Sequence, residues 1–78
     1  MVSAKVDKVL DCQGTLCPLP VILAKKAIDV LAPGQVLQIL ATDPGARADI
    51  PAWCRRTGHK ILEATEAGGA LSFLVERV

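Results

Sequence analysis

The 78-residue sequence lacks several features that would define a protein class at once. It has no tyrosine, one tryptophan and one phenylalanine, so it offers no row of aromatic rings on which nucleic-acid bases could stack. Lysine and arginine total 9, aspartate and glutamate total 8, and no run of like charge follows a phosphate backbone. We therefore expect no direct contact with nucleic acid.

Long hydrophobic runs are also missing. Stretches such as residues 21–24 are far shorter than the roughly 20 apolar residues that cross a bilayer, and the first residues lack the apolar core of a secretory signal. These absences predict a cytoplasmic protein without a membrane contact. The 3 cysteines are an odd number, which speaks against a disulfide framework and leaves at least one thiol free in a reducing compartment.

The composition is that of a small packed domain. Hydrophobic residues make up 51% of the chain and charged residues 22%, which excludes intrinsic disorder. A chain of this length buries only about 60% of its unfolded surface and supports one core. We therefore predict a single domain that spans residues 1–78.

Hydrophobic patterns and the positions of glycine and proline divide the chain into six elements. The predicted elements are a strand at 5–11, a helix at 18–31, a strand at 36–42, a helix that ends at 57, and strands at 60–66 and 70–77. Val30 is expected on the apolar side of the first helix. Pro51 is expected to kink the second helix, which would restart at a cap formed by Asp49. The order βαβαββ predicts an α+β fold, a two-layer α/β sandwich in which two helices cover a mixed four-stranded sheet.

Cys17 gives the strongest chemical signal. It occupies the predicted cap of the first helix, where Ser, Thr, Asp or Asn would bind the free N–H groups better. The positive end of a helix favours a thiolate, whereas Pro18 and Pro20 have no N–H to donate to the sulfur. We expect a partly activated thiol, which suits reversible transfer because a strongly stabilised thiolate attacks more weakly. The alternative is a small buried cysteine beside a helix start.

The other two cysteines give weaker signals. Cys12 ends the first strand and is expected to pack there; a role as a resolving thiol for Cys17 is a less favoured alternative, because this spacing is no redox motif. Cys54 lies on the apolar face of the second helix beside Trp53, where a structural role is expected. Together with His59, the three cysteines would complete a Cys3His zinc site, an alternative that their spacings do not favour.

Exposed residues near both helix starts are candidate contacts for a protein partner. Ile22 falls on the polar side of the first helix with Lys25 and Lys26, and the three could form a small docking patch. At the start of the second helix, Asp43 is expected to act as a cap and Arg47 to be a solvated arginine. Docking is the alternative role for this second pair.

Taken together, these motifs resemble the TusA/SirA-like family of small sulfur carrier proteins. The matching motifs are Leu10-Asp11, Gly14, Cys17-Pro18-Leu19-Pro20, Pro33-Gly34, Ala41-Thr42-Asp43-Pro44, Asp49-Ile50-Pro51, Trp53-Cys54 and Gly58-His59. The resemblance implies that Cys17 accepts a sulfane sulfur as a persulfide, supported by Gly14, Pro18, Leu19 and Pro20. It also implies the two-layer sandwich, no cofactor, and a docking role for an acid and an arginine, which Asp43 and Arg47 would supply.

The resemblance further implies a relay between proteins. A donor of the cysteine desulfurase or rhodanese type would present the sulfur, and an acceptor thiol protein of the DsrE or TusBCD type would take it. We expect a monomer that forms transient complexes with both. A regulatory or redox module of the same fold that transfers no sulfur is the alternative function.

Overall fold

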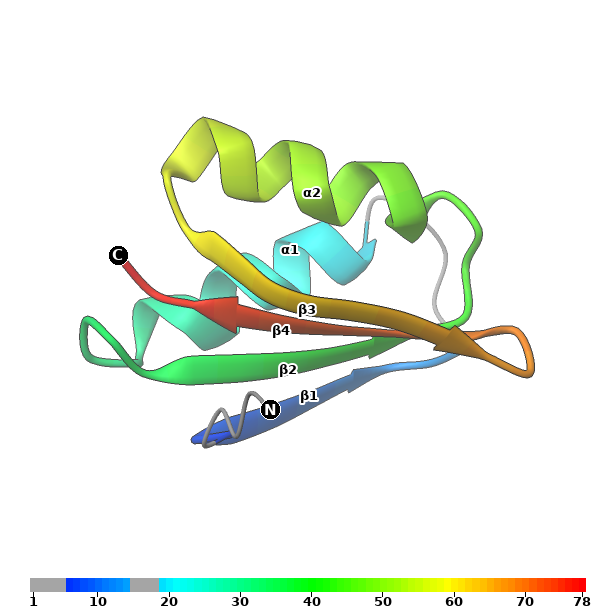
Figure 1. The fold of residues 1–78 in the computed structure, drawn as a ribbon, viewed down its shortest axis with the longest axis horizontal. Coiled ribbons are helices and arrows are strands. Elements are labelled where there is room, and N and C mark those ends of the chain that lie inside the picture. The colour runs from blue at the N-terminus through cyan, green and yellow to red at the C-terminus, as the bar shows by residue number, and fades with distance from the viewer. Residues whose placement is uncertain (1–5, 15–18) are drawn as a thin grey trace.

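The structure is a computed structural model that describes residues 6–14 and 19–78 (Figure 1). The elements are β1 (Lys8–Cys12), α1 (Leu19–Asp29), β2 (Val36–Ala41), α2 (Ala46–Thr57), β3 (Lys60–Ala67) and β4 (Ala70–Glu76). Both helices lie on the same side of the sheet, as Figure 1 shows. The predicted order βαβαββ and the two-layer α+β sandwich are confirmed. No helix within the described ranges is long and apolar enough to cross a membrane.

The sheet is mixed and has the strand order β1-β2-β4-β3. The β1 and β2 strands are parallel because α1 connects them as a crossover, whereas β4 is antiparallel to both of its neighbours. One row of paired residues crosses the whole sheet in the order Cys12, Ala41, Leu71, Glu66. We call the end of the sheet that this row marks the Cys12 end. At the other end of the strands, Val36, Glu76 and Lys60 are paired, and we call it the Val36 end.

The core lies between the sheet and the helices. Alternate residues of β2 and β4 face it, as the two-residue period of a strand requires, and β4 shows this most regularly. Fully or almost fully buried side chains from the strands include Leu37, Ile39, Leu71, Phe73 and Val75. Removing these apolar side chains from water is the main favourable term that holds the two layers together.

The α1 helix contributes Ala24, Ala27 and Ile28 to the core, which are three and four residues apart and therefore share one side. The prediction for Val30 is wrong, since its side chain is 70% exposed. The buried row of α1 continues to Leu31, whereas Val30 lies two positions after Ile28 and therefore points to the opposite side.

The α2 helix runs without interruption through Pro51, so the predicted restart at Asp49 is wrong. The N-cap residue is Gly45, which has no side chain to cap the helix. A proline inside a helix costs about 3 kcal/mol. Ile50 and Trp53, on either side of the proline, are both buried, and burial of such side chains offsets a cost of this size.

Glycines lie before and after β3 and determine how the chain turns there. Gly58 adopts a left-handed conformation with φ of 84°, and its N–H donates to the Cys54 carbonyl at 2.8 Å, which ends α2. Gly68 and Gly69 both have positive φ values, as a tight turn between antiparallel strands requires. The predicted helix stop and the predicted final hairpin are both confirmed.

Candidate functional site

Cys17 and Pro18 lie outside the described residues, as do the side chains of Leu19 and Pro20. In the sequence, Cys17 stands three residues after Gly14 and two residues before the first residue of α1. The described structure therefore shows the turn after β1 that precedes the motif and the helix α1 that follows it.

Gly14 is fixed to the neighbouring strand connection. Its N–H donates to Oγ1 of Thr42, the residue after β2, at 2.9 Å. The φ angle of Gly14 is 83°, a backbone conformation that residues with a Cβ atom rarely adopt. One residue earlier, the Gln13 N–H donates to Oδ1 of Asp11 at 2.9 Å. The turn after β1 is thus tied to the residue that follows β2.

Asp43 organises the chain between β2 and α2. Its Oδ1 accepts the N–H of Gly45 at 3.3 Å, and its main-chain carbonyl accepts the N–H of Ala46 at 3.0 Å. The carboxylate therefore stabilises the turn that leads into α2. Thr42, Asp43 and the start of α2 all follow the carboxyl end of β2, so they gather at the Cys12 end together with Gly14.

The predicted docking residues of α1 are all exposed. Ile22 is 47% exposed, which is high for an apolar side chain in a helix, and Lys26 is exposed as well. Lys25 forms an ion pair with Asp29 at 3.3 Å, and an exposed pair of this kind contributes only about 0.3–0.5 kcal/mol. The structure thus leaves the Ile22 side of α1 accessible.

Arg47 is exposed, as predicted, but it also forms an ion pair that the sequence did not predict. Its Nη2 donates to Oε1 of Glu66 on β3 at 2.5 Å, which links the first turn of α2 to the edge of the sheet. Sequence reasoning missed Glu66 altogether. The two residues are 19 positions apart, and only the order of the strands, with β3 at the edge, brings them together.

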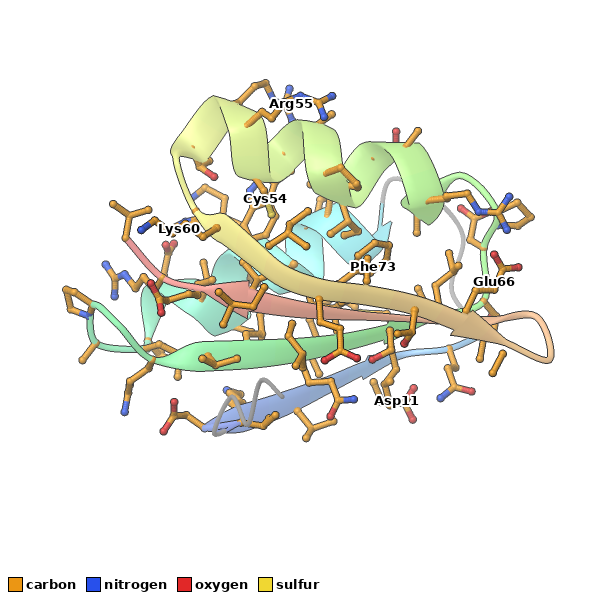
Figure 2. All side chains as sticks on the ribbon, viewed as in Figure 1. Asp11, Cys54, Arg55, Lys60, Glu66 and Phe73 are labelled. Atoms are coloured by element: carbon orange, nitrogen blue, oxygen red, sulfur yellow. The ribbon has the colours of Figure 1, made fainter. Side chains whose placement is uncertain are left out.

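Cys12 and Cys54 are both core residues, as predicted. They are 0% and 2% exposed, and Figure 2 shows Cys54 between α2 and the sheet. Burial raises the pKa of Cys54 to about 11. Burial, and to a lesser extent the Asp11 carboxylate, raises the pKa of Cys12. Both thiols are therefore protonated at neutral pH and poor nucleophiles, which disfavours the resolving role for Cys12.

His59 belongs to the Val36 end of the molecule. Its Nδ1 accepts the N–H of Val78 at 3.1 Å, and its ring centroid lies 5.4 Å from that of Trp53. Partial burial lowers the pKa of His59, Arg77 adds to this effect, and Asp29 opposes it. Within residues 6–14 and 19–78, no three His, Cys, Asp or Glu side chains form a metal-binding group. Cys12, Cys54 and His59 thus do not converge.

The fold and the position of the cysteine motif together define a small two-layer sandwich with a thiol motif before its first helix. Residues 8–77 match the family model described as Sulfurtransferase TusA. The chain belongs to this TusA family, which confirms the resemblance that its motifs carry.

Individual relatives cover almost the whole chain. The sulfur carrier protein TusA of Allochromatium vinosum is 42% identical over 74 residues, which are 95% of this chain and 97% of the relative. The YrkI protein of Bacillus subtilis is 45% identical over 73 residues, or 94% of this chain and 97% of the relative. The crystal structure of a SirA-like protein from Desulfitobacterium hafniense superimposes with a TM-score of 0.77 at 25% identity, and the match covers 88% of this chain and 95% of that one.

Proposed function

We propose that this chain is a sulfur carrier in which Cys17 holds a sulfane sulfur as a persulfide. Membership of the TusA family, with relatives named sulfur carrier proteins, supports sulfur carriage and does not favour the regulatory or redox alternative. The choice of Cys17 is supported by the state of the other two cysteines. Cys12 and Cys54 are buried thiols with raised pKa values, and the chain has only 3 cysteines.

Loading of the carrier is a thiol exchange. The Cys17 thiolate attacks the terminal sulfur of a donor persulfide, a new S–S bond forms at Cys17, and the donor S–S bond breaks. The donor cysteine leaves as a thiolate with the bonding electron pair and takes up a proton from solvent. Because one S–S bond replaces another, no net oxidation occurs and no cofactor is needed.

Unloading repeats the same exchange in the opposite sense. A thiolate of the acceptor protein attacks the terminal sulfur of the Cys17 persulfide, and Cys17 leaves as a thiolate. A thiol that both attacks and leaves well suits the two steps, since nucleophilicity and leaving ability change in opposite directions with thiol acidity. The start of α1 supports this balance, because a helix N-terminus favours a thiolate while the prolines of the motif supply no N–H.

The exchange requires a donor protein that carries a persulfide and an acceptor protein with a thiol. The family resemblance implies their types: a cysteine desulfurase or rhodanese as donor, and a thiol protein of the DsrE or TusBCD type as acceptor. We assign docking to the exposed residues Ile22, Lys25, Lys26 and Arg47 and to the half-buried Asp43. The carrier works as a cytoplasmic monomer that binds each partner transiently.

Intact-protein mass spectrometry tests the assignment. After incubation with a sulfur donor such as inorganic polysulfide, the parent protein should gain the mass of one sulfur atom and lose it on reduction. Cys17→Ser should gain none, whereas the matched variant Cys12→Ala should load like the parent. Loading of Cys17→Ser at the parent level would refute the assignment. A disulfide between Cys12 and Cys17 in a protein that takes up no sulfur would instead support the redox module.

A further inference from the structure

A hollow opens between α2 and the β3–β4 hairpin. Its volume is about 240 Å³, which is smaller than the roughly 300–1,000 Å³ of small-molecule sites. The residues that line it are Arg47, Pro51, Ala64, Thr65, Glu66, Leu71 and Phe73. Leu71 and Phe73 belong to the core row of β4, and Figure 2 shows Phe73 beneath α2 and Glu66 toward the hairpin. The hollow therefore offers an apolar floor of the size that suits one bulky side chain.

The hollow lies at the Cys12 end of the sheet, the end at which β1 finishes before Gly14. Leu71 and Glu66 stand in the row of paired residues that begins at Cys12. Neighbouring strands lie about 4.8 Å apart, so three strand spacings place the hollow about 14 Å from the end of β1. A protein that reaches the segment after β1 is large enough to cover the hollow at the same time.

An exposed ion pair forms the polar rim. Arg47 and Glu66 are 62% and 47% exposed and face each other at 2.5 Å. Ion pairs at the surface are weakly held, and a guanidinium carries five N–H donors that suit a planar carboxylate. A carboxylate brought by a partner can therefore take the place of Glu66 on Arg47.

The charge of the helices favours an acidic partner surface. The sequences of α1 and α2 contain five basic and two acidic residues, whereas β3 and β4 contain one basic and three acidic residues. Arg55 points away from the sheet on the outer side of α2, as Figure 2 shows. A partner that approaches over α2 thus meets three basic residues and one acidic residue on that helix, which favours a carboxylate at Arg47.

We propose that this hollow seats a single bulky apolar side chain of the protein that exchanges sulfur with Cys17, and that an adjacent carboxylate of that protein binds Arg47 in place of Glu66. The inference rests on the proposed sulfur carriage and adds the chemistry of the partner surface: an apolar anchor next to an acidic residue. Glu66 then acts as an internal competitor for the same guanidinium.

Two substitutions that each remove one charge test whether Glu66 and the partner carboxylate compete for Arg47, because their expected effects are opposite. Loading of Cys17 is measured with a purified cysteine desulfurase or rhodanese, whichever loads the parent, and separately with inorganic polysulfide. Arg47→Gln should raise the KM for the protein donor about tenfold, and Glu66→Gln should lower it about threefold, as expected for gain or loss of one charge contact. Loading by polysulfide should be unchanged in both. If both variants weaken protein-donor loading equally, the ion pair is merely structural and the proposal is wrong.

A variant that fills the hollow tests the anchor. Ala64 is exposed at the hollow, so Ala64→Phe can occupy it without overpacking the core, and the matched control Ala32→Phe lies in the exposed loop before β2. Ala64→Phe should reduce protein-donor loading about tenfold, while the control and all polysulfide loading stay at the parent level. Parent-level loading of Ala64→Phe by the protein donor would overturn the proposal. Failure of the parent to take sulfur even from polysulfide would instead refute the carriage on which it rests.

Discussion

The Cys12 end and the Val36 end of the sheet differ in the kind of contact that holds them together. At the Val36 end, main-chain groups pair across the molecule: the Gly34 N–H donates to the Arg77 carbonyl and the Arg77 N–H donates to the Gln35 carbonyl, both at 2.9 Å. The Arg77 guanidinium also donates to the Leu31 carbonyl just after α1. These contacts tie the segment before β2 to the segment after β4.

The Cys12 end depends on exposed polar contacts instead. They are the Gly14 to Thr42 hydrogen bond, the turn at Asp43 and the ion pair of Arg47 with Glu66. Exposed contacts contribute little stability, but they can be exchanged when another protein binds. The difference teaches that main-chain hydrogen bonds hold the Val36 end, whereas side-chain contacts that a partner can replace hold the Cys12 end. The three predictions below test this contrast, from the largest expected effect to the smallest.

The largest effect is expected in the half of α2 that leads to the Val36 end. Cys54→Ser places a hydroxyl in a site that is 2% exposed and should lower the free energy of unfolding by about 1–3 kcal/mol. Sulfur loading at Cys17 should be unchanged below the melting transition. Chemical denaturation measures the first effect, and Cys54→Ala is the matched control that loses the sulfur without adding a polar group. Equal stability of parent and Cys54→Ser would contradict the structural role.

A smaller and local effect is expected at the Cys12 end. Thr42→Val removes the oxygen that accepts the Gly14 N–H, and a hydrogen bond of this kind contributes about 0.5–1.5 kcal/mol. Hydrogen exchange of the Gly14 amide should therefore accelerate about two- to tenfold, while amides of the core strands keep their protection. Thr42→Ser retains the hydroxyl and should exchange like the parent. Unchanged exchange in Thr42→Val would show that the tether does not hold the turn.

The smallest effect is the pH dependence at His59. Since the pKa of His59 is lowered in the folded protein, the unfolded chain binds the proton more readily. Stability from this residue is thus fully present above the ordinary histidine pKa and falls as the pH drops below it. The melting temperature should decrease slightly more between pH 7.5 and 5.5 in the parent than in His59→Gln. An identical decrease in both proteins would show that folding does not lower the pKa of His59, and would contradict its contribution to the Val36 end.

Much of the fold was predictable because each element follows a local rule. The alternation in β4, the helical period of α1 and the stop at Gly58 all depend on neighbours in the sequence. Pro51 was misread because a local rule assigns it a break, whereas burial of Ile50 and Trp53 maintains the helix. Val30 is apolar but lies two positions after the buried Ile28, so the helical period itself turns it away from the core.

The site was less predictable from the residues alone. Cap chemistry and spacing pointed to Cys17 as a reactive thiol, but the persulfide role came from the family resemblance. The contact of Arg47 with Glu66 and the hollow beside it depend on strand order and on the packing of α2 over β3 and β4. No local pattern carries that information, which is why both emerged only from the structure.

The central claim is that Cys17, of the 3 cysteines, carries the sulfur. The most direct measurement is peptide mapping by tandem mass spectrometry after polysulfide loading and alkylation of the persulfide. The account predicts the extra sulfur on the peptide that contains Cys17, with Cys12 and Cys54 unmodified until the protein is unfolded. Recovery of the extra sulfur on Cys12 or Cys54 in the native protein would contradict it.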